Sequence, residues 1–182
     1  MDKTDIGKLL ITNHHKFVET ITSVPDAQFE LQPNGKWSTG QQLEHIIKSV
    51  TPVDTAFGLP RFVLKMKFGL SNRKIKSYDE LVKQYLKVLD DNRGYVLPKR
   101  FAPDTVEVKS KNKKLDQLKK LVDSLVSRLS KYPEKEFDEL ILPHPVMGKL
   151  TLREILFFTA YHAEHHDKHI IPNINTMHNA KS

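Results

Sequence analysis

The chain has 182 residues, a length that fits one domain with a hydrophobic core of its own. It contains no cysteine, which excludes disulfide bonds, thiolate metal ligands and a cysteine nucleophile. No signal-peptide core begins the chain, and no apolar run reaches membrane-spanning length. We therefore expect a soluble protein of the cytoplasm with no membrane partner.

The formal net charge is +7, and the basic residues are densest in 61–76 and 99–120. A nucleic-acid-binding protein would use such charge as a basic face. The lysines of 109–120, however, alternate with leucines, which is typical of the solvent-facing side of an amphipathic helix. Nucleic-acid binding is therefore the less favoured interpretation.

The first half of the chain predicts two helices joined by a loop. Residues 4–23 carry apolar side chains at helical spacing, and we expect the two histidines within them, His14 and His15, at the surface. Residues 24–37 hold two prolines and an Asn-Gly pair, which indicates a loop. Ser38 begins the second helix in a capping box, and Pro52 predicts a kink or an end. The main apolar stripe of this helix is Leu43, Ile46, Ile47, Val50, Val53 and Phe57.

His45 lies well round this second helix from its main stripe. It shares a second face with small or polar residues, namely Gln41, Ser49, Pro52 and Ala56. Periodicity alone predicts that His45 lies at the periphery of the core. A helix in a bundle, however, contacts two or more neighbours, so a second face of it can also be buried.

The middle of the chain predicts a short helix, two longer helices and a long connection. A short helix and a turn at 69–72 fit residues 61–76, and a capping box at Ser77 begins a helix that runs to about Asn92. Residues 94–108 are irregular, which is typical of a long crossover between helices. A leucine stripe over 115–129 predicts a helix, and residues 142–150 form a proline- and glycine-containing turn. No strand-like alternation is evident, so the fold class is all-α.

The last predicted helix, 151–171, contains the residues best suited to a chemical function. Thr151 and Glu154 form a capping box at its start. His162 and His166 are four residues apart, a spacing that suits two neighbouring positions on a metal ion. The alternative is that both rings tuck one edge into the core and reach water with a nitrogen. The residues that share one face of this helix are Leu152, Ile155, Leu156, Thr159, His162, Ala163, His166 and Ile170.

Three blocks of the sequence stand out together, namely WSTGQQLEH (37–45), HPVMGKLTLRE (144–154) and YHAEHHDKHI (161–170). In their order and spacing they resemble the DinB-like proteins, a superfamily that includes YfiT-like metal-dependent hydrolases and thiol-dependent S-transferases. The resemblance implies a single four-helix bundle domain over 1–182, with a long crossover and short extra helices. It also implies a metal site formed by His45 of the second helix and by His162 and His166 of the last.

Three further histidines belong to these blocks, and one of them, His165, points to a neighbouring face of the last helix. His169 lies one turn beyond His166, at a position that is commonly glutamine in relatives, so it is a local departure that we expect to support a ligand or contact substrate. His144 belongs to the turn block, where we expect a structural role. Glu44 and Asp167 adjoin the ligands in sequence but point elsewhere on their helices, so we expect both at the surface. The alternative is that either carboxylate orients a histidine ring from a neighbouring helix.

A three-histidine set favours zinc or nickel and leaves coordination positions open, as in catalytic sites. The resemblance therefore implies a metal-dependent hydrolase or thiol S-transferase with a small-molecule substrate and, for transfer, a thiol cosubstrate. The sequence assigns no general base. The alternative is a non-catalytic bundle that binds metal or dimerises through a helix face. A homodimer is compatible with this sequence, but no residue pattern in it fixes the oligomeric state.

Overall fold

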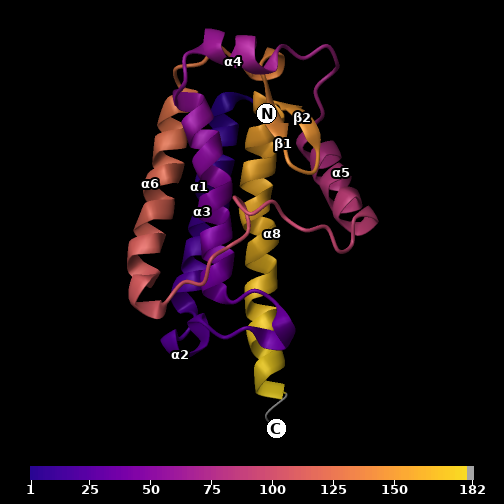
Figure 1. Ribbon diagram of the computed structural model, residues 1–182. Helices are drawn as coiled ribbons and strands as arrows, with labels where there is room; N and C mark the ends of the chain where they lie inside the picture. Colours follow the sequence, from indigo (N-terminus) through magenta and orange to yellow (C-terminus); the bar gives the residue numbers. More distant parts are fainter. Residues whose placement is uncertain (180–182) are drawn as a thin grey trace.

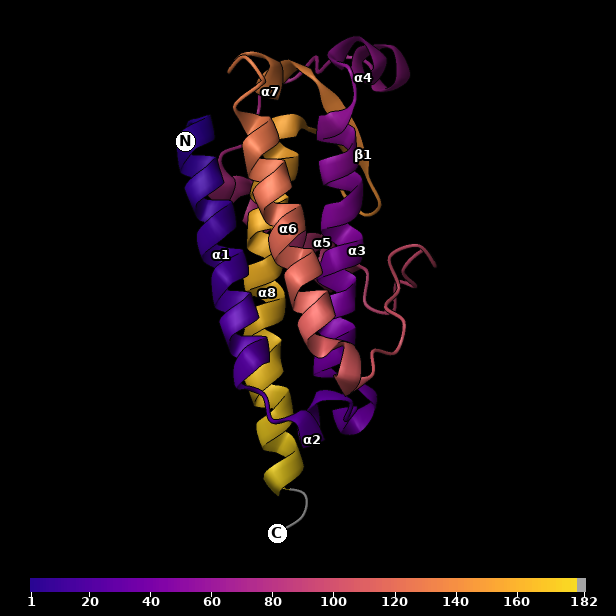
Figure 2. The same ribbon diagram turned by 90° about the vertical axis from the view of Figure 1, so that its left-hand side faces the viewer.

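The computed structural model describes residues 1–179 and contains a bundle of four long helices. These are α1 (Lys3–Ser23), α3 (Thr39–Gly58), α6 (Lys111–Leu129) and α8 (Leu152–Asn179). The four helices run side by side, with α1 packed between α8 and α6, and α3 packed against α6 and α8 (Figures 1 and 2). The predicted all-α class and four-helix bundle are confirmed.

Short elements connect the long helices. The segment that follows α5 crosses in front of α8 in Figure 1 to reach α6, and it is the predicted long crossover. Of the other connecting elements, α4 lies across one end of the bundle and α5 packs along α8. The short elements are α2 (Asp26–Phe29), α4 (Arg61–Phe68), α5 (Tyr78–Asp91), α7 (Glu136–Glu139), β1 (Ile141–His144) and β2 (Gly148–Thr151), with 3-10 turns at Pro33–Gly35 and Val108–Ser110.

All three predicted capping boxes are present. The hydroxyl oxygens of Ser38 and Ser77 accept hydrogen bonds from the third backbone N–H of α3 and α5, respectively. The hydroxyl of Thr151 accepts from the backbone N–H of Glu154 at 3.2 Å, and the Glu154 carboxylate accepts from the backbone N–H of Thr151 at 2.9 Å. These signals act within one turn, so the sequence alone was enough to predict them.

The proline- and glycine-containing turn is a β-hairpin, which the sequence did not predict. Strands β1 and β2 pair antiparallel, with Ile141 opposite Thr151 and His144 opposite Gly148. Each strand has four residues, and its buried positions are adjacent instead of alternating. The period-two signal that indicates a strand is therefore missing.

The proline that we expected to kink or end the second helix lies within it. Helix α3 continues through Pro52 to Gly58, and α8 likewise continues beyond the predicted 151–171 through Pro172. The stretch of α3 beyond Pro52 is held by tertiary packing, because the buried ring of Phe57 contacts Tyr132 and Phe137, with ring centroids 5.1 and 6.2 Å apart. Such packing compensates for the one helical hydrogen bond that a proline removes.

The predicted surface position of His14 is wrong. His15 is exposed, but His14 is buried, and its Nδ1 donates to the backbone carbonyl of Leu10 at 2.8 Å. Helix α1 packs against both α8 and α6, so a wider part of its circumference is buried than one apolar stripe indicates. Within the described part of the chain, none of the helices has the length and apolar character needed to cross a bilayer.

Candidate metal centre

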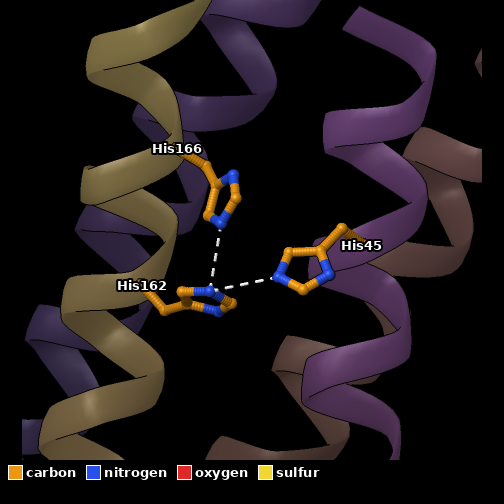
Figure 3. A group of neighbouring side chains, drawn as sticks. All are labelled: His45, His162 and His166. Carbon is orange, nitrogen blue, oxygen red and sulfur yellow. Dashed lines mark hydrogen bonds between the residues drawn. The ribbon is translucent and has the colours of Figure 1, made fainter. Parts of the chain in front are cut away.

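Three histidine side chains converge between α3 and α8 (Figure 3). His45 comes from α3, and His162 and His166 come from successive turns of α8. The Nε2 atom of His162 lies 3.3 Å from that of His45 and 3.0 Å from that of His166. All three side chains are buried, and the candidate ligand atoms lie within 4.8 Å of one another.

Two of the three nitrogen separations match the geometry of a shared divalent ion. Nitrogen ligands about 2.1 Å from a metal ion, separated by angles of roughly 90–110°, lie about 3.0–3.4 Å from each other. The separations from His162 to His45 and to His166, 3.3 and 3.0 Å, fall in this range, and the ligand atoms of His45 and His166 lie within 4.8 Å of each other.

Hydrogen bonds to the opposite ring nitrogens set the tautomers of two of the histidines. The Nδ1 of His45 donates to the backbone carbonyl of Phe101 at 2.8 Å, and the Nδ1 of His166 donates to the side-chain oxygen of Gln42. Since a carbonyl oxygen can only accept, both Nδ1 atoms carry the proton. When the rings are neutral, their Nε2 lone pairs therefore face the centre of the cluster, as metal ligation requires.

Burial keeps these rings neutral. It lowers the pKa of His162 and His166 well below the ordinary value, and the neighbouring histidines lower it further. Burial also lowers the pKa of His45, against the opposing effect of its hydrogen bond to Phe101. A neutral imidazole is the form that binds a metal ion, so the site is ready for a ligand role near pH 7.

Aromatic rings hold the three imidazoles in place. The indole of Trp37 packs on His45, with ring centroids 4.9 Å apart, and is nearly parallel to the ring of His166 at 6.0 Å. The ring of Phe158 stacks on His162 at 4.8 Å. Packing from both sides limits rotation of the rings and keeps the nitrogen atoms converged.

A cavity of about 940 Å³ opens beside the histidines. Its wall is formed by α3, α5, the crossover, the β-hairpin and α8. This volume lies in the upper part of the range of small-molecule sites, about 300–1,000 Å³. The cluster therefore has access to a space in which a substrate can bind.

The other histidines of the resemblance lie near the cluster but outside it. His165 lines the cavity, and His169, which is exposed, packs on it with ring centroids 4.8 Å apart. His144 also lines the cavity from the hairpin, where its Nδ1 accepts from the backbone N–H of Val146 and Met147 at 3.3 and 3.1 Å.

The predicted surface positions of two carboxylates are wrong. Glu44 is buried in the cavity wall, with its Oε2 2.6 Å from the Nζ of Lys114. Asp167 is also buried, with its Oδ2 3.7 Å from the Nζ of Lys16. Both side chains therefore face lysines of neighbouring helices, which periodicity within one helix does not reveal.

With the fold and the cluster described, the chain can be compared with known proteins. The sequence model of the DinB superfamily matches residues 9–170. The chain belongs to the DinB superfamily. No match was found among curated proteins.

The fold of this DinB-superfamily chain is also similar to a solved structure, that of YfiT from Bacillus subtilis. The TM-score is 0.61 at 19% sequence identity, and the match covers 96% of this chain and 87% of that one. YfiT is described as a probable metal-dependent hydrolase with an unusual four-helix bundle topology. At this identity, the likeness supports the shared fold.

Gln42 and Phe101 are the parts of the centre that sequence reasoning missed. Gln42 lies within the first of the three blocks, one turn before His45, and the oxygen of its side-chain amide can accept a hydrogen bond from an imidazole N–H. Phe101 contributes only a backbone carbonyl, which has no signature in the amino-acid sequence.

Proposed function

We propose that this DinB-superfamily chain is a metal-dependent enzyme whose single divalent ion is held by His45, His162 and His166. The observation that carries the proposal is the convergence of three neutral imidazole nitrogens at the wall of a substrate-sized cavity. The printed description of YfiT as a probable metal-dependent hydrolase supports the same reading.

We propose zinc or nickel as the ion, because all three ligands are imidazole nitrogens. Three protein ligands also leave room for a further ligand, which is the pattern of catalytic sites. An ion bound there supplies Lewis acidity to a substrate carbonyl, to water or to a thiol.

The reaction we propose is hydrolysis of a small molecule or transfer of a group to a thiol. The chain has no cysteine, so the thiol must come from a cosubstrate. Burial lowers the pKa of His144 and of His165 to about 4, so both cavity-lining rings are neutral near pH 7. Since the Nδ1 of His144 accepts from two backbone N–H groups, its Nε2 carries the proton and can donate a hydrogen bond to a substrate. We place His169 behind His165, where its ring contact orients that imidazole.

The test of the metal centre is elemental analysis of protein purified without a polyhistidine tag. We expect near-stoichiometric metal in the native protein and its loss in His45→Ala and in His162→Ala, with unchanged far-UV circular dichroism. His15→Ala is the matched control, because this histidine is exposed on α1 and lies outside the cluster. Metal that remains at full occupancy in His162→Ala would refute the proposed ligand set.

The reaction type is tested next on the loaded protein. Ester, amide and thiol-transfer substrates are screened with and without a low-molecular-weight thiol, and product must form with the native protein and fail to form with His162→Ala. Full metal occupancy with no turnover in any arm would favour the alternative, a metal-binding bundle without catalysis. The mass in solution checks whether the chain forms a homodimer.

A further inference from the structure

The cavity beside the histidines is a trough that follows α3. The α3 residues on its wall include His45, Ser49, Pro52 and Ala56, which recur every three or four positions and so lie on one face of the helix. Leu59, the residue that ends α3, continues this face, and neighbours such as Lys48, Thr51 and Val53 widen the wall. From His45 to Leu59 this face rises about 1.5 Å per residue, which makes it about 21 Å long.

This wall explains the small residues on the second face of α3. The face that carries Pro52 and Ala56 lines open space, whereas Leu43, Ile46, Val50 and Phe57 of the main stripe pack into the bundle core. Ala56 is half-buried, and its methyl group leaves the width of the trough free. The second face of α3 therefore shapes a binding site.

The wall beyond the histidines is mostly apolar. It is formed by side chains of α3, α4, α5, the crossover, the hairpin and α8. These are Val53, Phe68, Leu89, Leu97, Leu142, Val146, Ile155 and Phe158. Apolar surface of this extent favours an apolar ligand, because each methylene group transferred from water into it adds to the affinity.

Most of the charged side chains of the wall are paired within the chain, and Arg100 instead packs its guanidinium over the ring of Phe101, 4.9 Å from the ring centroid. Lys48 donates to Asp104 at 2.7 Å, and Glu44 faces Lys114 at 2.6 Å. Arg93 pairs with an aspartate of its own turn. These pairs reduce the attraction of the trough for a highly charged ligand, so its chemistry matches an apolar chain better than a polyanion.

We propose that the substrate of this site is an elongated amphiphile. Its polar, reacting group lies at His45, His162 and His166, and its alkyl or aryl tail extends along α3 past Pro52 toward Leu59. The inference rests on the proposed function for the reacting group. The binding of the tail, however, needs only the trough, so the two are tested separately.

The test is binding of straight-chain carboxylates, from butanoate to hexadecanoate, to metal-stripped protein. Trp37 is the only tryptophan in the chain and lies on the cavity wall beside His45, so its fluorescence reports on this site alone. We expect affinity to rise roughly fourfold with each added methylene until the trough is filled. Equal affinity for butanoate and hexadecanoate would overturn the proposal.

Substitutions in the trough show where the tail binds. Ala56→Phe places a ring across the trough, about 16 Å beyond His45 along α3. We expect it to weaken hexadecanoate binding at least tenfold and to leave octanoate, which ends nearer the histidines, unchanged. Ala27→Phe is the matched control, because Ala27 is exposed on α2 outside the trough. Equal effects of the two substitutions would refute the assignment.

Leu59→Asp is a second variant that does not depend on packing a larger ring. Leu59 is 37% exposed at the far end of the trough, so an aspartate there is compatible with folding. It must weaken hexadecanoate selectively. If the affinity rises with the chain length of the carboxylate but the protein binds no metal, the trough is supported and the proposed enzyme is refuted. If the protein binds metal but the affinity does not depend on chain length, the proposed metal centre stands and the trough is refuted.

Discussion

The carboxylate of Glu154 joins two distant parts of the chain, and its removal is the sharpest test of how the fold is held together. The side chain is fully buried at the start of α8. It accepts two hydrogen bonds from the guanidinium of Arg73, at 2.7 and 2.6 Å, and one from the backbone N–H of Lys76 at 2.9 Å. A fourth comes from the backbone N–H of Thr151. Glu154 therefore anchors the loop that follows α4 to the last helix.

The expected effect of Glu154→Gln follows from the pKa. Burial alone would raise the pKa of Glu154, but the hydrogen bonds from Arg73, Thr151 and Lys76 outweigh burial and lower it from 4.5 to about 2. A shift of this size corresponds to about 3 kcal/mol of folding free energy. The side chain of Arg73 is 36% exposed, and solvent screens part of the attraction. We therefore expect the substitution to destabilise the protein by about 2 kcal/mol at pH 7.

The assay is urea denaturation followed by far-UV circular dichroism. Glu80→Gln is the matched control, since Glu80 occupies the same capping-box position at the start of α5 but is exposed, and we expect little change there. Because the folded-state pKa of Glu154 lies below its unfolded value, its contribution is complete above pH 4.5 and is lost as the pH falls toward 2. Two results would refute this reasoning. One is a loss of unfolding free energy in Glu154→Gln no larger than the loss in Glu80→Gln. The other is that Glu154→Gln destabilises the Arg73→Gln variant as much as it destabilises the native protein.

Three further predictions test other parts of the structure. Gln42→Leu removes the acceptor that orients one ligand imidazole, so metal affinity measured against a competing chelator must fall about 10–100-fold, and an unchanged affinity contradicts the role. Burial lowers the pKa of His14 to about 4, so acidification from pH 7 to 5 favours the unfolded state. In urea titrations, His14→Leu must remove about 2 kcal/mol of this acid destabilisation, and the prediction is refuted if the unfolding free energies of the variant and the native protein fall in parallel with pH. Gly40→Ala places a methyl group 3.0 Å from the carbonyl oxygen of Val106 and must destabilise by about 1–3 kcal/mol, whereas Gly58→Ala meets only a flexible arginine and must lose less in the same assay.

Local signals in the sequence were sufficient for most of the helices. A capping box needs only residues three apart, and all three that were predicted are present. The face of α8 that carries His162 and His166 was equally readable, because residues three and four apart are neighbours on any helix, and all eight residues assigned to that face are buried.

The missed features depend on groups far apart in the sequence. The β-hairpin has strands too short for a periodic signal, and α3 passes Pro52 because Phe57 is packed against another part of the chain. The ion pair between Arg73 and Glu154 joins residues 81 positions apart, and neither residue alone indicates the other.

The sequence by itself determined the order of the helices, their starting points and the two stacked histidines of α8, because these follow from periodicity within one helix. Only the tertiary structure brought His45 to them, since the rotation of α3 against α8 is decided by packing. Packing likewise placed the Phe101 carbonyl behind His45 and left the small-residue face of α3 as the wall of an open trough. Contacts between side chains of different helices form only in the assembled bundle, so the free energy that they contribute to folding cannot be inferred from any one segment of the sequence.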